Sequence, residues 1–207
     1  MITIPPLWPR RHRRLERGVA AIEAALLMPV AIFLVLGCVE TYQYFRAEAL
    51  INRVAFTVAN GVAMQQTLYD RSQCTKSDDI CIYNTITNDL FEPLDYAAHG
   101  GLIISAFVTT DIVIDEAGNS TVSWQNAPKW FKSYKGSPTA NDPASRLTDT
   151  DIFPPPKAGD TLIVAEVFYA HEPYIMSSKF WAALGGTRQM YSRFVFRPRF
   201  DDLRELK

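Results

Sequence analysis

The chain has 207 residues, of which 48% are hydrophobic, and a formal net charge of -1 at pH 7. The first 17 residues hold five of its 21 Lys and Arg but one of its 22 Asp and Glu, which leaves 16 basic and 21 acidic residues in the rest. No basic patch therefore remains to suggest a nucleic-acid partner. The histidines, His12, His99 and His171, are scattered, and neither glycine pair has the spacing of a phosphate loop, so we expect no metal site, no cofactor and no enzyme.

Residues 1–40 combine a basic leader with an apolar segment. Residues 1–9 are interrupted by prolines, and residues 10–17 contain the five arginines. From Val19 to Val39 every residue is apolar or small except Glu23. Twenty-one helical residues span roughly the 30 Å hydrocarbon thickness of a bilayer, so residues 19–39 are predicted to cross a membrane. The one-sided cationic flank predicts that the N-terminus is cytoplasmic and that residues 40–207 form a periplasmic domain.

Glu23 is the unusual residue of this segment, because a carboxylate in a spanning helix costs a few kcal/mol. One explanation is that its side chain reaches water at the nearby interface. The surrounding pattern offers another. The arginines are followed by Gly18-Val19-Ala20-Ala21-Ile22-Glu23 and then by Leu26-Leu27-Met28-Pro29. This order resembles the processing site of type IV-like prepilins. In particular, it resembles the N-terminal signature of TadE/TadG-type minor pseudopilins of the tight-adherence (Tad, or Flp) pilus system.

This resemblance implies an inner-membrane protein that prepilin peptidase cleaves between Gly18 and Val19, removing residues 1–18. It further implies a structural role in initiating, capping or assembling a pilus for adherence, with membrane lipid, other pilin subunits and the Tad inner-membrane assembly platform as partners. Cleavage would create an α-amino group at Val19, and Glu23 of a neighbouring subunit could pair with it. One departure is Ala24, where the family commonly has Phe or Tyr.

Residues 41–70 continue the helical pattern, with apolar side chains at three- and four-residue steps and no proline. We therefore expect one long helix, with its first half in lipid and its second half packed on a domain. Pro29 is expected to bend this helix. The stretch from Arg46 to Asn60 also resembles the corresponding part of the family.

The cysteines suggest a disulfide and one alternative function. Cys74 and Cys81 enclose a polar extracytoplasmic loop, which favours a disulfide over a metal pair or two free thiols. Cys38 lies in the apolar segment and is most simply a small apolar residue. Residues 35–38 (VLGC) also approximate a lipobox, so a lipoprotein lipidated at Cys38 is one rival reading. An uncleaved single-pass anchor that presents a periplasmic binding or scaffold domain is another.

The remaining segments predict a small sheet. Residues 83–96 read as a short helix, and residues 102–115 and 120–125 as the strands of a hairpin. Residues 127–160 are rich in proline and turn residues, which predicts a long surface excursion, or a segment that is part lid and part partner-contact loop. Its Trp130, Phe131 and Tyr134 would either fold back onto the sheet or contact another subunit.

The C-terminal part is expected to alternate strand, helix and strand. Residues 161–170 and 188–197 are the strands and residues 173–184 the helix, with His171 and Glu172 as a surface pair at a turn. In the last strand Met190, Phe194 and Phe196 would share one face. The sequence therefore predicts a pilin-like α+β fold, in which a long N-terminal helix packs on a small, mainly antiparallel sheet.

Overall fold

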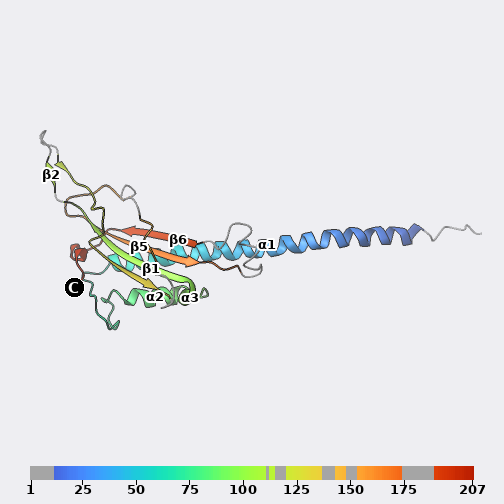
Figure 1. Ribbon diagram of the computed structural model, residues 1–207, viewed down its shortest axis with the longest axis horizontal. Coiled ribbons are helices and arrows are strands. Elements are labelled where there is room, and N and C mark those ends of the chain that lie inside the picture. The colour runs from blue at the N-terminus through green and yellow to red at the C-terminus, as the bar shows by residue number, and fades with distance from the viewer. Residues whose placement is uncertain (1–11, 111, 115–119, 137–142, 148–152, 174–188) are drawn as a thin grey trace, which may run out of the picture. The chain divides into compact units, whose positions relative to one another are not determined.

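The computed structural model describes residues 12–110, 112–114, 120–136, 143–147, 153–173 and 189–207 (Figure 1). The chain divides into two compact units, Met1–Gln43 and Tyr44–Lys207. The second unit is called the C-terminal domain below. Residues 21–39, which lie in the first unit, are called the apolar segment. One helix, α1 (His12–Ala63), contributes residues to both units.

The length of α1 follows from its sequence, because no glycine pair or second proline interrupts it after Pro29. Its part from Ala21 onward is long and apolar enough to cross a membrane by length and composition, and it is the one such helix among the described residues. The prediction that the helix continues to residue 70 is wrong, because α1 ends at Ala63. The apolar stripe stops there: Gln65 and Gln66 stand where the next buried residues would lie.

Four antiparallel strands form the sheet of the C-terminal domain, in the order β4-β1-β5-β6. They are β1 (Gly100–Val108), β4 (Trp130–Lys135), β5 (Thr161–Ala170) and β6 (Gln189–Phe196). Strand β5 coincides with its predicted range, and β6 lies within its own. The central strands β1 and β5 are buried on both faces, which explains their nearly continuous apolar sequences.

Strand β4 corrects the prediction that residues 127–160 form only a surface excursion. Its residues pair with β1 in a regular antiparallel register, from Trp130 opposite Ala106 to Lys135 opposite Gly101. Trp130 and Tyr134 pack against the core, as one of the two alternatives for these aromatics required. Phe131 points the other way and is 62% exposed. The alternating pattern of an edge strand is therefore present, but prolines and turn residues surround it in the sequence.

The predicted hairpin is shorter than expected. Its ladder consists of β2 (Val113–Ile114) and β3 (Ser120–Thr121), with an isolated bridge between Thr109 and Trp124. The first predicted strand is divided, because β1 ends at Val108 and takes its partners from β4 and β5 instead. The turn at the tip lies outside the described residues.

Two short helices precede the sheet in the chain, α2 (Ile82–Leu90) and α3 (Tyr96–His99). The single helix predicted over residues 83–96 is thus interrupted, at the segment that contains Pro93. A 3-10 helix, η1 (Asp201–Arg204), lies near the C-terminal end. The helix predicted over residues 173–184 lies almost entirely outside the described residues.

The main core lies between one face of the sheet and the last turns of α1 (Figure 1). Every third or fourth residue of α1 is fully buried there, including Val54, Val58 and Val62, and these side chains meet Leu102 and Ile104 of β1. A smaller cluster covers the opposite face and consists of Phe107, Trp124, Phe153, Leu162 and Val164. The architecture is α+β with a long N-terminal helix on a small antiparallel sheet, which confirms the predicted fold class.

Candidate functional site

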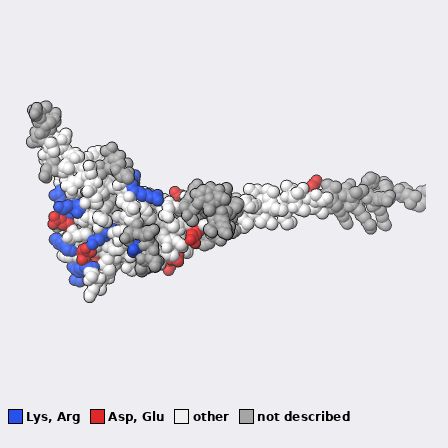
Figure 2. Space-filling view, viewed as in Figure 1, with Lys and Arg blue, Asp and Glu red and all other residues white. Residues whose placement is uncertain are grey.

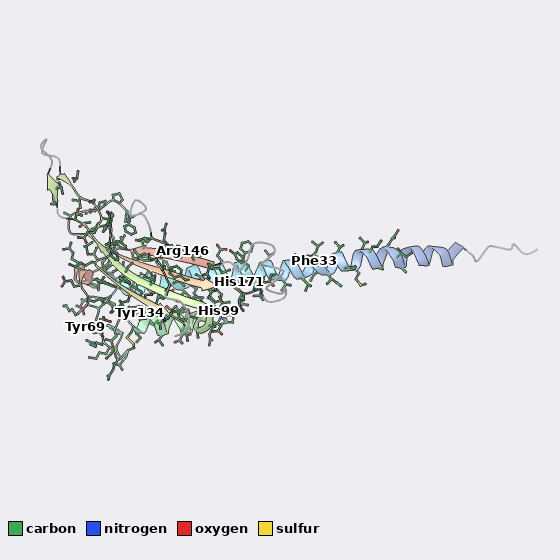
Figure 3. The ribbon with its side chains drawn as sticks, viewed as in Figure 1. Phe33, Tyr69, His99, Tyr134, Arg146 and His171 are labelled. Atoms are coloured by element: carbon green, nitrogen blue, oxygen red, sulfur yellow. A yellow bond between two sulfur atoms is a disulfide. The ribbon has the colours of Figure 1, made fainter. Side chains whose placement is uncertain are left out.

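The apolar segment of α1 exposes its side chains on all sides of the helix. Its large hydrophobic residues between positions 22 and 35 have exposed fractions from 54% at Ile32 to 70% at Leu26. Soluble monomeric proteins rarely expose a continuous apolar surface of more than a few hundred Å². A helix that is apolar all round is stable when lipid or other apolar helices surround it. This segment is therefore the first candidate for function. Phe33, near its middle, is labelled in Figure 3.

Gly18, Val19 and Glu23, the residues that the sequence singled out, all lie within α1. The backbone at Gly18 and Val19 is helical, and Glu23 is one turn further along the same face as Val19. The Glu23 side chain is exposed and has no ion-pair partner among the side chains that the structure describes. The helix thus presents the Glu23 carboxylate at the beginning of a long apolar surface.

Cys38, the residue of the lipoprotein alternative, lies near the end of the apolar segment. Its thiol is free and exposed. An alanine side chain at its neighbour Gly37 would meet no atom within 4 Å, so the helix surface is open here too.

Comparison with known proteins adds a family to this geometry. Residues 18–60 match the family model described as TadE-like protein. This part of the chain is therefore similar to TadE-like proteins. No curated protein and no solved structure matches the chain.

The TadE-like match confirms the resemblance noted in the sequence, and it begins at Gly18 itself. It covers the apolar segment and continues into the buried stripe of α1 as far as residue 60. The TadE-like family is a structural, pilus-associated family, and the similarity of residues 18–60 to it suggests an association with the Tad pilus. The apolar helix is consistent with a single-pass membrane protein.

Beyond the TadE-like part, Cys74 and Cys81 form a disulfide with a Cα–Cα distance of 5.6 Å, as their spacing predicted. The enclosed loop is organised by Asp79, whose side chain is fully buried. Its carboxylate accepts hydrogen bonds from the backbone N–H of Thr75 (3.2 Å) and Lys76 (3.0 Å) and from the Arg71 guanidinium (2.7 Å).

These contacts set the charges of the loop. Desolvation acts to raise the pKa of Asp79, but the N–H groups of Lys76 and Thr75 and the Arg71 cation outweigh it and hold the pKa below its ordinary value. Desolvation likewise acts to lower the pKa of Arg71, and its hydrogen bonds and attraction to Asp78 and Asp79 raise it overall. Arg71 also stacks over the Tyr69 ring, 3.9 Å from its centroid. The disulfide loop is thus a charged, internally bonded unit.

Sequence reasoning missed Glu166, a fully buried carboxylate in the middle of β5. It accepts hydrogen bonds from Ser145 Oγ (2.6 Å), the Arg146 backbone N–H (3.0 Å) and Tyr191 Oη (2.7 Å). The Arg146 guanidinium lies over the Tyr191 ring at 5.3 Å, and Figure 3 shows it beside the sheet. Burial and the neighbouring Glu166 raise the pKa of Tyr191, so its hydroxyl stays a donor. Through these hydrogen bonds, Glu166 holds residues 143–147 against the outer face of the sheet. A charge inside an apolar run was its only sequence signal.

His171 corrects the prediction of a surface pair at a turn. It is 7% exposed and its ring lies edge-on to Tyr44 of α1, with centroids 5.7 Å apart. Glu172 is exposed, and its carboxylate is 3.9 Å from Nε2 of His99. His99 and His171 lie at the same end of the sheet, where β1 begins and β5 ends (Figure 3). Neither histidine belongs to a metal-binding group among the described residues.

Proposed function

We propose that this chain is a minor pseudopilin-like structural subunit of a Tad/Flp pilus, which helps to initiate, cap or assemble the fibre. The observation that carries the proposal is that the TadE-like match begins at Gly18 and covers a helix whose apolar surface is exposed on all sides. Before assembly, the inner-membrane lipid covers this surface. In the fibre, the helices of other pilin subunits replace the lipid.

In this proposal the arginine-rich leader keeps residues 1–18 at the cytoplasmic face, and residues 40–207 form the periplasmic domain. Lys and Arg at one end of a short first helix favour this orientation, and anionic headgroups attract the leader. The Tad inner-membrane platform would then draw the subunit out of the membrane. The C-terminal domain keeps its own core during this step, because its buried stripe is separate from the exposed apolar segment.

Prepilin peptidase would cut between Gly18 and Val19. A protease cleft holds its substrate in an extended conformation, whereas both residues are helical here, so the first turns of α1 must open for cleavage. Glycine favours this opening, because it destabilises a helix by about 1 kcal/mol relative to alanine. Gly18 thus serves two purposes: it weakens the helix at the scissile bond and leaves space in the cleft.

Cleavage gives Glu23 its proposed role. The new Val19 ammonium and the Glu23 carboxylate lie at the same end of the apolar surface, and each is unfavourable in an apolar surrounding when unpaired. When two subunits pack with a small axial stagger, Glu23 of one reaches the Val19 ammonium of the other. Any other axial stagger between the two subunits is less stable, since it leaves both charges unpaired.

The N-terminus of membrane-extracted protein tests the processing step. Intact mass spectrometry from cells that make Tad pili is expected to give a chain that begins at Val19, and Gly18→Ala is expected to accumulate the full-length form. A chain beginning at Met1 would mean an uncleaved single-pass anchor with a binding or scaffold domain. A lipidated Cys38 at the N-terminus would mean a lipoprotein. Either of these results would refute the proposed processing.

The role of Glu23 is tested separately from cleavage. Glu23→Ala is expected to leave the mature N-terminus at Val19 but to reduce the amount of this subunit in sheared pili, because the Val19 ammonium loses its partner. Glu23→Asp, which retains the charge, is the matched control and should retain part of the incorporation. Wild-type incorporation of Glu23→Ala would contradict the pairing.

A further inference from the structure

A pocket of about 430 Å³ opens in the C-terminal domain at the end of the sheet where β1 finishes. Its wall combines Val108, Thr109 and Thr110 with the turn at Gly159 and with Arg204 of η1. Small-molecule sites commonly have volumes of about 300–1,000 Å³. The pocket therefore has the capacity for a ligand of about the size of one sugar ring. This inference does not depend on the proposed pilus role.

Two cations line this pocket, Lys129 and Arg204, against one acid, Glu205. Lys129 Nζ is 3.9 Å from Glu205 Oε1, and these side chains are 48% and 75% exposed, so solvent screens their attraction. Arg204 has no ion-pair partner among the described residues, and its Nη2 lies 3.7 Å from the position that a Cβ on Gly159 would take. Figure 2 shows Lys and Arg side chains, with some Asp and Glu side chains between them, at this end of the domain, which Figure 1 marks with the C-terminus. The pocket is thus suited to a negative charge.

The uncharged residues that line the pocket include three polar ones, Thr109, Thr110 and Gln125. The Gln125 amide makes no hydrogen bond to the described residues, whereas the Thr110 hydroxyl already bonds to Ser123. An apolar ligand would leave the Gln125 amide unpaired.

We propose that this pocket binds a hydroxylated carboxylate, of which a uronic acid is the simplest example. Its carboxylate lies between the Lys129 ammonium and the Arg204 guanidinium, which donates two parallel hydrogen bonds to a planar anion. The Gln125 amide bonds to ring hydroxyls, and the side chains of Val108 and Ile112 cover the ring carbons. Glu205 opposes the ligand charge and limits the affinity.

Isothermal titration calorimetry of the full chain in a non-ionic detergent tests this site, with glucuronate, glucose and inorganic phosphate as probes. Glucuronate is expected to bind, and glucose is expected to bind at least tenfold more weakly, because it lacks the carboxylate. Inorganic phosphate has no ring hydroxyls and is also expected to bind more weakly than glucuronate. Equal binding of phosphate, or no binding of glucuronate, would overturn the assignment.

Variants that remove single charges test which side chains form the site. Arg204→Gln and Lys129→Gln are each expected to weaken glucuronate binding about tenfold, which corresponds to one charge-assisted hydrogen bond. Glu205→Gln is expected to strengthen it, because a repelling charge is removed. Lys76→Gln, an exposed lysine of the disulfide loop, is the matched control and should bind like the unaltered chain. Unchanged binding in Arg204→Gln, or weaker binding in Glu205→Gln, would refute the proposal, provided that each variant unfolds at the temperature of the unaltered chain.

Discussion

The two parts of α1 place their apolar residues in opposite surroundings. In the apolar segment Leu27 is 68% exposed, whereas Ile51, in the C-terminal domain, is 1% exposed. The difference lies in the distribution of apolar residues around the helix. Residues 24–36 are apolar on every side, but from residue 46 onward charged and polar residues separate a buried stripe. An apolar stripe indicates one packed face, whereas an apolar circumference indicates a non-aqueous environment.

The apolar segment and the C-terminal domain also differ in the surroundings of a carboxylate. Glu23 is exposed on the apolar segment and has no ion-pair partner among the described side chains, whereas Glu166 is fully buried in β5 and accepts three hydrogen bonds. In the proposed pairing, Glu23 takes its partner from another subunit, whereas Glu166 has its partners within the chain. We therefore expect changes in the C-terminal domain to affect folding, and changes in the apolar segment to affect membrane insertion or assembly.

Leu-to-Ala and Ile-to-Ala substitutions give the largest expected contrast. Ile51→Ala is expected to lower the free energy of unfolding of the C-terminal domain by about 2–5 kcal/mol, because it leaves a cavity in a packed core. Leu27→Ala should change it by less than about 0.5 kcal/mol. Chemical unfolding of the full chain in detergent, followed by near-UV circular dichroism, measures both. Equal effects would mean that the apolar segment also contributes to the core.

The two glutamates give a smaller contrast. Glu166→Ala is expected to destabilise the domain by about 3 kcal/mol, because Tyr191, Ser145 and the Arg146 backbone N–H lose their acceptor. Ser145→Ala removes one of these bonds and should cost about 1 kcal/mol. Glu23→Ala is the control from the other region and should leave domain unfolding unchanged. If Glu166→Ala unfolds like the unaltered chain, the carboxylate does not hold residues 143–147 in place.

Local patterns were sufficient to predict the long helix, β5, β6 and the disulfide. The helix periodicity, the apolar run of residues 161–170 and the spacing of Cys74 and Cys81 are all signals within a few residues. The TadE-like match begins at Gly18 and includes the Gly18 to Glu23 motif on which the resemblance was based. These features could be predicted because each depends on neighbours in the sequence.

The errors concern features that depend on distant residues. Leu68 reads as a continuation of the helical stripe, but it is buried after α1 has ended, where its carbonyl accepts a bond from Lys207. Strand β4 exists because β1 offers it an edge, and His171 is buried because Tyr44 packs against it. Glu166 could be noticed as a charge in an apolar strand, but its donors come from residues 145, 146 and 191.

The smallest expected contrast is in acid unfolding, which should affect the C-terminal domain but not the helix of the apolar segment. The pKa of Asp79 in the folded domain lies below its ordinary value of 3.8, so the stability that its ionised form contributes is complete above about pH 3.8 and is lost as the pH falls through the lowered pKa. Asp79→Asn is therefore expected to destabilise the domain near neutral pH and to flatten the acid dependence below pH 4. Asp89→Asn removes an exposed carboxylate and is the control.

Near-UV circular dichroism follows the unfolding of the domain. Far-UV circular dichroism in detergent should show that the helix of the apolar segment persists, since its helicity comes from apolar surroundings rather than from Asp79. An unchanged acid dependence in Asp79→Asn would mean that other carboxylates govern acid unfolding, and loss of all helix together with the domain would mean that the two parts of α1 unfold as one unit.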